Sequence, residues 1–340
     1  MSSRMRPQII PRISEAIKVH PILFDKSPNN SDHILEFQGV SKRYGQHLAL
    51  ADVSVAIRPG VTGLLGPNGS GKSTLIKAIL GLVKIDAGSG QVLSYPWPLQ
   101  TRTIRDKVGY LPEDDCYILG LQGIESVQMM ARLSGIEKTE ALRRAHEVLD
   151  FCDVGQERYR NVETYSTGMR QKLKFAQAIV HDPPMIILDE PTTGLDPAQR
   201  EEFLDRIAAL SNIHGKSVIL STHILHDVQQ VCDSVVILAN GRVRLADSLS
   251  NLQRPARAGL HLQVIDHADR LSRELNLLGF QSQPINAQSL QVWELSDRSR
   301  SEIWRASSQC GVLIQRMEES KTSLEQTFLE IVSGPQNANT

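Results

Sequence analysis

The 340-residue sequence predicts an α/β fold, in which a mostly parallel sheet is covered by helices on both faces. Two observations predict it. A glycine-rich segment, Gly66–Thr74, lies between an apolar run and a helical pattern, and after Tyr165 apolar strands alternate with helices. Beyond about Asn251 an independent set of strand and helix patterns predicts a small α+β domain. We therefore expect a poorly ordered N-terminal extension over 1–33, a main domain over 34–250 and an accessory domain over 255–335.

The elements of the first part of the main domain are short strands around the glycine-rich segment. Apolar runs predict strands at Ile34–Phe37, Leu48–Ile57, Val61–Leu65 and Lys107–Leu111, and Leu75–Leu80 has a helical pattern. The second strand alternates apolar and polar residues, which is typical of a strand that buries one face. Residues 1–33 carry basic residues and prolines without the apolar core of a signal peptide.

A helical insert of about 114–165 separates the glycine-rich segment from the later strands. Its helices are predicted at Ile124–Leu133 and Thr139–Cys152. The second helix is expected to bury one face, formed by Leu142, Ala145, Val148 and Leu149. We interpret the insert as a helical subdomain.

After the insert the alternation of strands and helices resumes. The predicted strands are Pro184–Leu188, Ser217–Ser221 and Ser234–Leu238, and the predicted helices are Gly168–His181, Pro197–Leu210 and His226–Cys232. Pro197 suits the first turn of its helix. In the accessory domain the predicted strands are Leu260–Ile265, Leu290–Leu295 and Val312–Met317, and the predicted helices are Ala268–Leu278, Arg298–Cys310 and Ser323–Val332. No catalytic constellation is found in that domain.

Composition excludes several classes of function. The hydrophobic and charged fractions, 41% and 22%, are ordinary for a globular protein. A net charge of −1 argues against a nucleic-acid-coating surface. No apolar run approaches the roughly 18–20 residues that cross a bilayer, so another chain must supply any membrane span. The cysteines lack paired spacing and are expected to be buried, unpaired thiols in a reducing cytoplasm: Cys116, Cys152, Cys232 and Cys310.

The glycine-rich segment has the complete pattern of a phosphate-binding loop. Its strand–loop–helix context lets backbone N–H groups and a helix N-terminus surround a polyphosphate. Lys72 is expected to reach the terminal phosphates, and the Ser73 hydroxyl to bind Mg²⁺. The candidate nucleotide-binding residues here are Gly66, Pro67, Asn68, Gly69, Ser70, Gly71, Lys72, Ser73 and Thr74. The alternative, a glycine turn before a helix, is disfavoured by the full match.

Two acids follow the predicted strand that ends near Leu188. Asp189 is suited to hold Mg²⁺ opposite Ser73, and Glu190 to polarise a water in line with the γ-phosphate. Phosphoryl transfer requires mainly positioning and charge neutralisation, so these two acids suffice. Solvated carboxylates at a strand end are the alternative. Their position downstream of a phosphate-binding loop disfavours it.

A second helix N-terminus of phosphate-binding type begins at Tyr165–Gln171. One nucleotide cannot easily occupy both this site and the Lys72 loop within a monomer. A head-to-tail dimer resolves the difficulty, because each ATP would then lie between one chain's loop and the other chain's Ser166 and Gly168.

These motifs resemble those of the nucleotide-binding subunits of ATP-binding cassette (ABC) transporters, over Ile34 to about Ser250. Tyr165–Met169 is similar to the Leu-Ser-Gly-Gly-Gln signature of that family, and its form resembles the bacterial subgroup that serves type-2 export permeases. The resemblance implies an ATPase that binds ATP and Mg²⁺ as a homodimer or pseudo-dimer and drives a separate transmembrane permease. It also implies a cytoplasmic protein, peripheral on the cytoplasmic face of the cell membrane, with no nucleic-acid partner.

The resemblance assigns roles to four further residues. Tyr44 matches the aromatic residue that stacks on adenine, and His223 matches the histidine that contacts the γ-phosphate. Taken alone, either residue would more often be structural. Asp196 matches the loop through which two subunits sense each other, and it could equally cap a helix. Glu113 stands where glutamine is commonest. It could approach Mg²⁺, and its charge predicts a stronger dependence of ATP affinity on Mg²⁺.

Other functions stay open. A soluble ABC-family ATPase acting on ribosomes or DNA is disfavoured, because the chain has one cassette and neither long coiled coils nor zinc modules. A GTPase is disfavoured by the lack of an Asn-Lys-x-Asp motif. The C-terminal domain could instead regulate the cassette, or merely extend the dimer interface.

Overall fold

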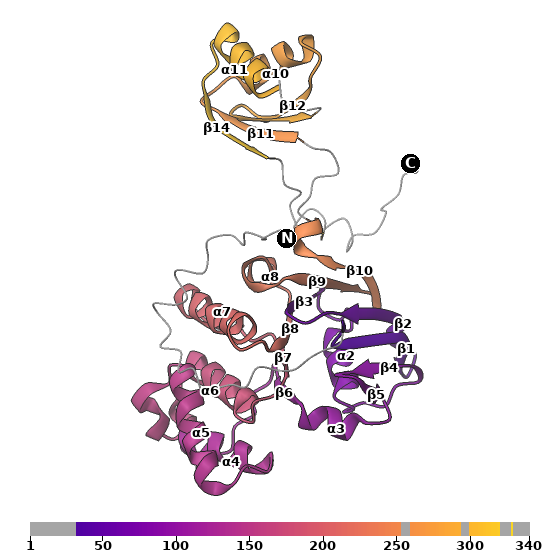
Figure 1. Ribbon diagram of the computed structural model, residues 1–340, viewed down its shortest axis with the longest axis vertical. Helices are drawn as coiled ribbons and strands as arrows, with labels where there is room; N and C mark the ends of the chain where they lie inside the picture. Colours follow the sequence, from indigo (N-terminus) through magenta and orange to yellow (C-terminus); the bar gives the residue numbers. More distant parts are fainter. Residues whose placement is uncertain (1–31, 253–258, 294–298, 320–327, 329–340) are drawn as a thin grey trace, which may run out of the picture. The chain divides into compact units, whose positions relative to one another are not determined.

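The computed structural model describes residues 32–252, 259–293, 299–319 and 328. The predicted N-terminal extension therefore lies almost wholly outside the described residues, as does the predicted helix Ser323–Val332 apart from Phe328, which is helical. The described residues fall into two compact units, which divide between Leu249 and Ser250 (Figure 1). No helix in the described part of the chain is long and apolar enough to cross a membrane.

The large unit is built on a six-stranded sheet in the order β10-β9-β3-β8-β7-β6. All neighbouring strands run parallel except β10, which pairs antiparallel with β9. The strands are β3 (Val61–Leu65), β6 (Val108–Leu111), β7 (Met185–Asp189), β8 (Ser217–Thr222), β9 (Ser234–Ala239) and β10 (Arg242–Ser248). Most of them are apolar runs because both faces of the sheet are covered. In β7, Met185 and Ile187 point into one core, and Ile186 and Leu188 into the other.

One of these cores lies between the parallel sheet and a second, antiparallel sheet. The second sheet has the order β2-β1-β4-β5, formed by β1 (Leu35–Tyr44), β2 (His47–Ile57), β4 (Ala87–Val92) and β5 (Tyr95–Trp97). Helix α2 (Lys72–Ile79) buries Leu75 and Ile76 in this core, and α3 (Thr101–Asp106) adds Ile104. The phosphate-binding loop is therefore fixed between two sheets.

The other core joins the opposite face of the parallel sheet to the helical part of the unit. The helices are α4 (Gly123–Leu133), α5 (Lys138–Phe151), α6 (Thr167–Ile179), α7 (Pro197–Asn212) and α8 (Leu225–Val231), with short 3₁₀ turns at Gly155–Tyr159 and Val162–Thr164. Figure 1 shows α4, α5 and α6 gathered at one end of the sheet. With helices on both faces of a mostly parallel sheet, the predicted α/β class is confirmed.

Two predictions of burial are wrong. In α5, Ala145, Val148 and Leu149 are buried as expected, but Leu142 is 41% exposed. Ala141 is buried instead, because it lies one turn before Ala145 on the face of α5 that packs into the core. Leu142 lies at the edge of that face. All four cysteines are free, but only Cys152 and Cys310 are buried as expected, whereas Cys232 is partly exposed and Cys116 is exposed.

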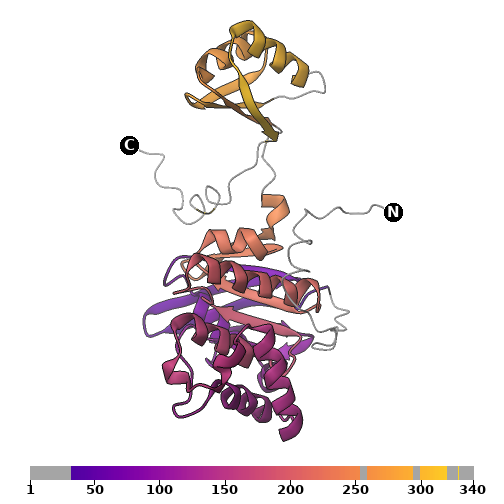
Figure 2. The same cartoon turned by 90° about the vertical axis from the view of Figure 1, so that its left-hand side faces the viewer.

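The small unit is a four-stranded antiparallel sheet with two helices. Its chain order is β11 (Gly259–Val264), α10 (Ala268–Leu277), β12 (Gln281–Asn286), β13 (Ser289–Trp293), α11 (Ser299–Cys310) and β14 (Ile314–Glu319). The strand order β12-β13-β11-β14 gives the βαββαβ arrangement of ferredoxin-like folds. Both helices lie on one face of the sheet (Figure 1 and Figure 2), and the unit has its own apolar core.

Candidate nucleotide-binding site

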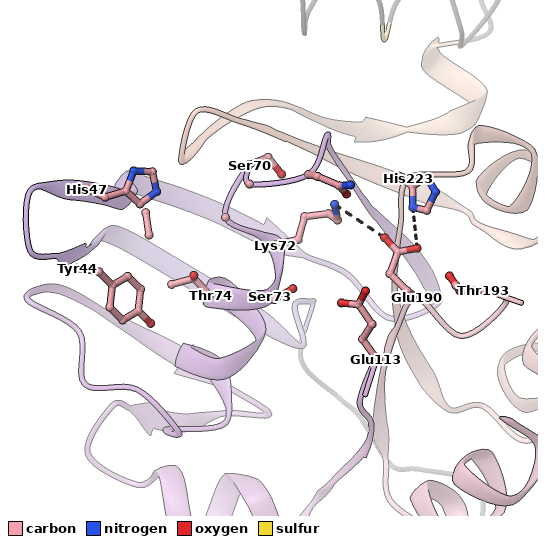
Figure 3. Close-up of a pocket in the computed structure, with 14 residues that line it drawn as sticks. Tyr44, His47, Ser70, Lys72, Ser73, Thr74, Glu113, Glu190, Thr193 and His223 are labelled. Carbon is pink, nitrogen blue, oxygen red and sulfur yellow. Dashed lines mark hydrogen bonds and ion pairs between the residues drawn. The ribbon is translucent and has the colours of Figure 1, made fainter. Parts of the chain in front are cut away.

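A pocket of about 450 Å³ lies where the carboxyl ends of the parallel strands meet the phosphate-binding loop. Figure 3 shows Tyr44 and His47 on one side of it, Glu113, Glu190 and His223 on the other, and Lys72 between them. The lining residues are Tyr44, His47, Ala49, Asn68, Gly69, Ser70, Gly71, Lys72, Ser73, Thr74, Glu113, Glu190, Thr193 and His223. The opening of α2 and the ends of β6, β7 and β8 supply most of the polar groups.

The shape of the loop depends on its glycines. Gly71 has a φ of 107°, and a Cβ atom there would lie 2.5 Å from the Ala49 carbonyl oxygen. At Gly66 a Cβ atom would lie 2.3 Å from the Leu238 carbonyl oxygen. Any side chain at either position would push the loop away from the sheets. Helix α2 begins at Lys72, directly after Gly71, so its first N–H groups face the pocket.

Lys72 is a buried cation in the middle of the pocket, only 7% exposed. Its Nζ donates to the Gly66 carbonyl oxygen at 2.7 Å and lies 3.9 Å from Glu190 Oε1. Burial lowers the pKa of Lys72, while the carboxylates of Glu190, Asp189 and Glu113 act in the opposite direction. The lysine thus lies among three acids, where a phosphate chain would be its natural additional partner.

Glu190 is held firmly despite its position in a turn after β7. Its N–H donates to the Ser221 carbonyl oxygen at 2.9 Å, and its Oε2 lies 3.0 Å from His223 Nδ1. The residue is 6% exposed and has a φ of 48°, a left-handed conformation that costs energy for any residue with a Cβ atom. The carboxylate therefore lies between Lys72 and His223 in a fixed orientation (Figure 3).

Asp189 lies at the last position of β7, next to Glu190, and is 2% exposed. Burial raises the pKa of Asp189. Hydrogen bonding to the Ser221 hydroxyl, the charge of Lys72 and hydrogen bonding to the Ser73 hydroxyl act in the opposite direction. Its buried Oδ1 has no hydrogen-bond partner among the described residues. A buried acceptor without a donor, close to a serine hydroxyl, fits a magnesium ion, which takes one or two protein ligands and completes its shell with water and phosphate oxygens. No group of three or more His, Cys, Asp or Glu side chains forms a denser metal site in the described ranges.

Three predicted nucleotide-binding residues lie away from the pocket. Ser166 is the N-cap of α6, and its Oγ accepts from the Met169 N–H at 3.3 Å. Asp196 is the N-cap of α7, where its Oδ1 accepts from the Gln199 N–H at 2.9 Å. Gly168 packs close to the same Gln199, because a Cβ atom would lie 2.6 Å from its Oε1. None of the three lines the pocket.

Of the remaining predicted residues, Gly66 and Pro67 turn their carbonyl oxygens toward Lys72 Nζ rather than lining the pocket. Sequence reasoning missed three lining residues, His47, Ala49 and Thr193. His47 pairs with Tyr44 across the turn between β1 and β2. A hairpin prediction for residues 44–47 would have found it, since paired residues share one face of a sheet.

Comparison with known proteins places this site in a family. The family model described as ABC transporter matches residues 50–193. An uncharacterised ABC transporter ATP-binding protein of Bacillus subtilis, YdbJ, is 37% identical over 220 residues, which cover 64% of this chain and 70% of the relative. The chain belongs to the ABC transporter ATP-binding proteins. It is therefore an ATPase and the ATP-binding subunit of a transporter.

Two further comparisons bear on how this ABC subunit works. The Nod factor export ATP-binding protein I of Rhizobium etli is 35% identical, over 61% of this chain and 66% of its own. A bacterial ABC transporter cassette solved as a dimer is 25% identical, with a TM-score of 0.59 over 63% of this chain and 98% of that one. This likeness confirms the predicted ABC cassette fold.

Proposed function

We propose that this ABC subunit works as a dimer that closes head to tail around two ATP molecules. The second subunit is either an identical chain or a similar one. The observation that carries the proposal is the distribution of phosphate-binding groups within one chain: Lys72 opens α2 inside the pocket, whereas Ser166 opens α6 outside it. A second copy placed head to tail would bring its Ser166, Gly168 and Asp196 to the open side of the bound ATP.

The lining residues support a division of roles around the nucleotide. Tyr44 would stack on adenine, and the N–H groups of the loop from Gly69 to Thr74 would bind the phosphates together with Lys72. Glu190 would take the proton of the attacking water, and His223, 3.0 Å from that carboxylate, would orient it and contact the γ-phosphate. Magnesium, held by Ser73, Asp189 and Glu113, would supply neutralising charge for the β- and γ-phosphates.

We further propose that ATP-driven closure drives export through a separate transmembrane permease on the cytoplasmic face of the membrane. The similarity to a Nod factor export ATP-binding protein supports this direction of transport. The helical subdomain, which lies between Glu113 and Ser166 in the sequence, is the natural contact for the permease. A closed dimer would favour one conformation of that partner because ATP binds the closed form more tightly.

The test uses a Glu190→Gln variant, which keeps the shape of the side chain and removes its basicity. We expect ATP binding to persist, turnover to fall about 10²- to 10⁴-fold, and an ATP-bound dimer to accumulate. Size-exclusion chromatography with and without ATP and a phosphate-release assay measure these effects. Glu201→Gln, an exposed acid on α7, is the matched control and should behave like the native chain.

The same tagged Glu190→Gln protein then tests the partner. It would be incubated with ATP and detergent-solubilised native membranes, and its co-purifying proteins identified by mass spectrometry. We expect a multi-spanning membrane protein that is absent when ATP is omitted. Recovery of ribosomal or DNA-repair proteins alone would contradict the transporter proposal, and near-native turnover of the variant would contradict the role of Glu190.

A further inference from the structure

A buried lysine outside the nucleotide pocket holds the loop that carries Glu113. Lys174 lies on α6 and is 5% exposed. Its Nζ donates to the carbonyl oxygens of three consecutive residues, Pro112 at 2.9 Å, Glu113 at 3.0 Å and Asp114 at 3.3 Å. An ammonium group has three N–H donors, so all of them are used on this one segment.

This arrangement makes the lysine and the loop depend on each other. Burial lowers the pKa of Lys174, and the nearby carboxylates and Cys116 act in the opposite direction. A buried ammonium is tolerated only where hydrogen bonds replace its water shell. If the loop moved away from α6, three carbonyl contacts would be lost at once and the charge would be left unsatisfied.

A second cation on the same helix contacts the same segment. Arg170 lies one turn before Lys174, and its Nη1 lies 3.1 Å from Asp115 Oδ2. Its guanidinium also lies 4.9 Å from the centre of the Tyr117 ring. We call residues 112–117 the sensor loop. It follows β6, has no regular secondary structure, and is exposed at Glu113, Asp114 and Asp115.

The location of Lys174 on α6 connects the two halves of the proposed dimer site. Ser166 caps the N-terminus of that helix, about two turns before Lys174. Glu113, whose carbonyl oxygen accepts from Lys174, has its side chain in the pocket of its own chain, opposite Lys72 (Figure 3). The carbonyl contacts therefore join the residue that faces the chain's own nucleotide to the helix that would face the partner's nucleotide.

We propose that Lys174 is a positioning residue that makes the sensor loop and α6 move as one body. It acts through the backbone of Glu113 and fixes the Glu113 carboxylate for hydrolysis, while Ser166 follows the same displacement. The inference rests on the proposed function for the part concerning the partner's nucleotide. The part concerning Glu113 does not depend on the dimer, because Glu113 lines the nucleotide pocket of its own chain.

The test replaces Lys174 by methionine, which keeps the length of the side chain and removes its donors. Using the full-length chain, we expect kcat for ATP to fall at least about tenfold, since small misplacements of catalytic groups have effects of this size, while KM changes less than about threefold. Amide hydrogen exchange in the sensor loop should become faster. Lys172→Met is the matched control, because Lys172 lies on the same helix but pairs with Asp153, away from the loop.

A double-mutant cycle separates positioning from general destabilisation. In a Glu113→Ala background, Lys174→Met should lower kcat by less than about threefold, because the group that it positions has been removed. An equal loss in both backgrounds, or unchanged exchange in the sensor loop, would overturn the proposal. If Lys174→Met does not fold, Arg170→Gln, which is more exposed, decides it by the same exchange and kcat measurements.

A separate measurement tests the dimer proposal, independently of the role of Lys174. ATP-dependent dimerisation is measured in the Glu190→Gln protein, and its absence would contradict the head-to-tail dimer. The kcat and exchange measurements on Lys174→Met would still decide whether this lysine fixes the sensor loop.

Discussion

Asp189 is a carboxylate whose burial weakens the free protein and whose position suits a metal ion. Its pKa is raised by burial, so the native state binds this proton more tightly than the unfolded chain does. Stability must then fall as pH rises above the ordinary carboxyl pKa of about 4, until the group is ionised in the native state as well. The ionised form is the one that Mg²⁺ needs.

An Asp189→Asn variant should therefore be more stable than the native chain without nucleotide. We expect its Tm to exceed the native value at pH 8, at roughly 2–4 °C per kcal/mol, and the gap to shrink at about pH 4, where the carboxyl group is protonated in the native state. With ATP and Mg²⁺ the order should reverse, because the native chain gains more from binding. Thermal unfolding at the two pH values measures this, with the exposed Asp106→Asn as control. A variant less stable than native at pH 8 would refute this account.

At the scale of residues, the sequence indicates which side chains line the pocket better than it indicates which hydrogen bonds hold them. Lys72 and Ser73 from the loop pattern, and Glu190 from the acids that follow a later strand, line one pocket in the structure, because the carboxyl ends of parallel strands meet at one edge of the sheet. The hydrogen bonds of Lys174 could not be predicted. They join residues about sixty positions apart, and no local pattern records that a lysine on an amphipathic helix points inward.

At the scale of elements, the N-terminus of α6 has two roles that substitutions can separate: a helix cap and, in the proposed dimer, a phosphate contact. Ser166 caps the helix, and in the proposed dimer it would also face the partner's γ-phosphate. Asparagine and aspartate are N-caps as good as serine, but aspartate adds a negative charge. The two substitutions therefore separate the cap from the contact.

We expect Ser166→Asn and Ser166→Asp to keep Tm within about 2 °C of native, whereas Ser166→Ala should cost about 0.5–2 kcal/mol. Combined with Glu190→Gln, the aspartate variant should fail to dimerise with ATP, since its carboxylate would repel the phosphates. The asparagine variant should still dimerise. Analytical ultracentrifugation with and without ATP compares them. Equal dimerisation of both would place Ser166 away from any phosphate.

Three of the strands that the sequence did not predict share a physical cause, whereas β5 and α3, which were also not predicted, each bury a single large apolar side chain, Trp97 and Ile104. Strands β4, β10 and β12 are short of buried side chains: β4 is largely glycine and exposed residues, and β10 and β12 lie at sheet edges. Apolar periodicity detects a strand only through the face that it buries. The interior strands β7, β8 and β9 were predicted within about one residue, because their apolar runs are buried on both faces.

At the scale of the whole molecule, the two units have separate apolar cores. Among the described residues, the buried core of the small unit contains only residues from Leu260 to Val312, and the two larger cores contain only residues from Ile34 to Leu238. Units with separate cores can fold separately, as domains do. The accessory domain predicted over 255–335 can be tested on this basis.

We expect a chain ending at Arg254 to fold and to hydrolyse ATP within about twofold of the native rate, because every residue lining the pocket precedes that position. Calorimetry should show one unfolding transition for it and two for the full chain. A large change in ATPase rate, with folding retained, would support a regulatory domain. A truncated chain that does not fold would contradict the independence of the units.

The left-handed backbone at Glu190 lowers the stability of the folded protein, whereas the proposed mechanism needs a glutamate at this position to hydrolyse ATP. Glycine or asparagine would occupy that conformation with less strain, and glutamate there costs on the order of 1–2 kcal/mol. A mutant library screened for heat resistance alone would therefore enrich glycine or asparagine at position 190. The most heat-resistant variants from such a screen would have lost ATPase activity. Laboratory evolution of this chain must therefore select for ATP turnover in every round.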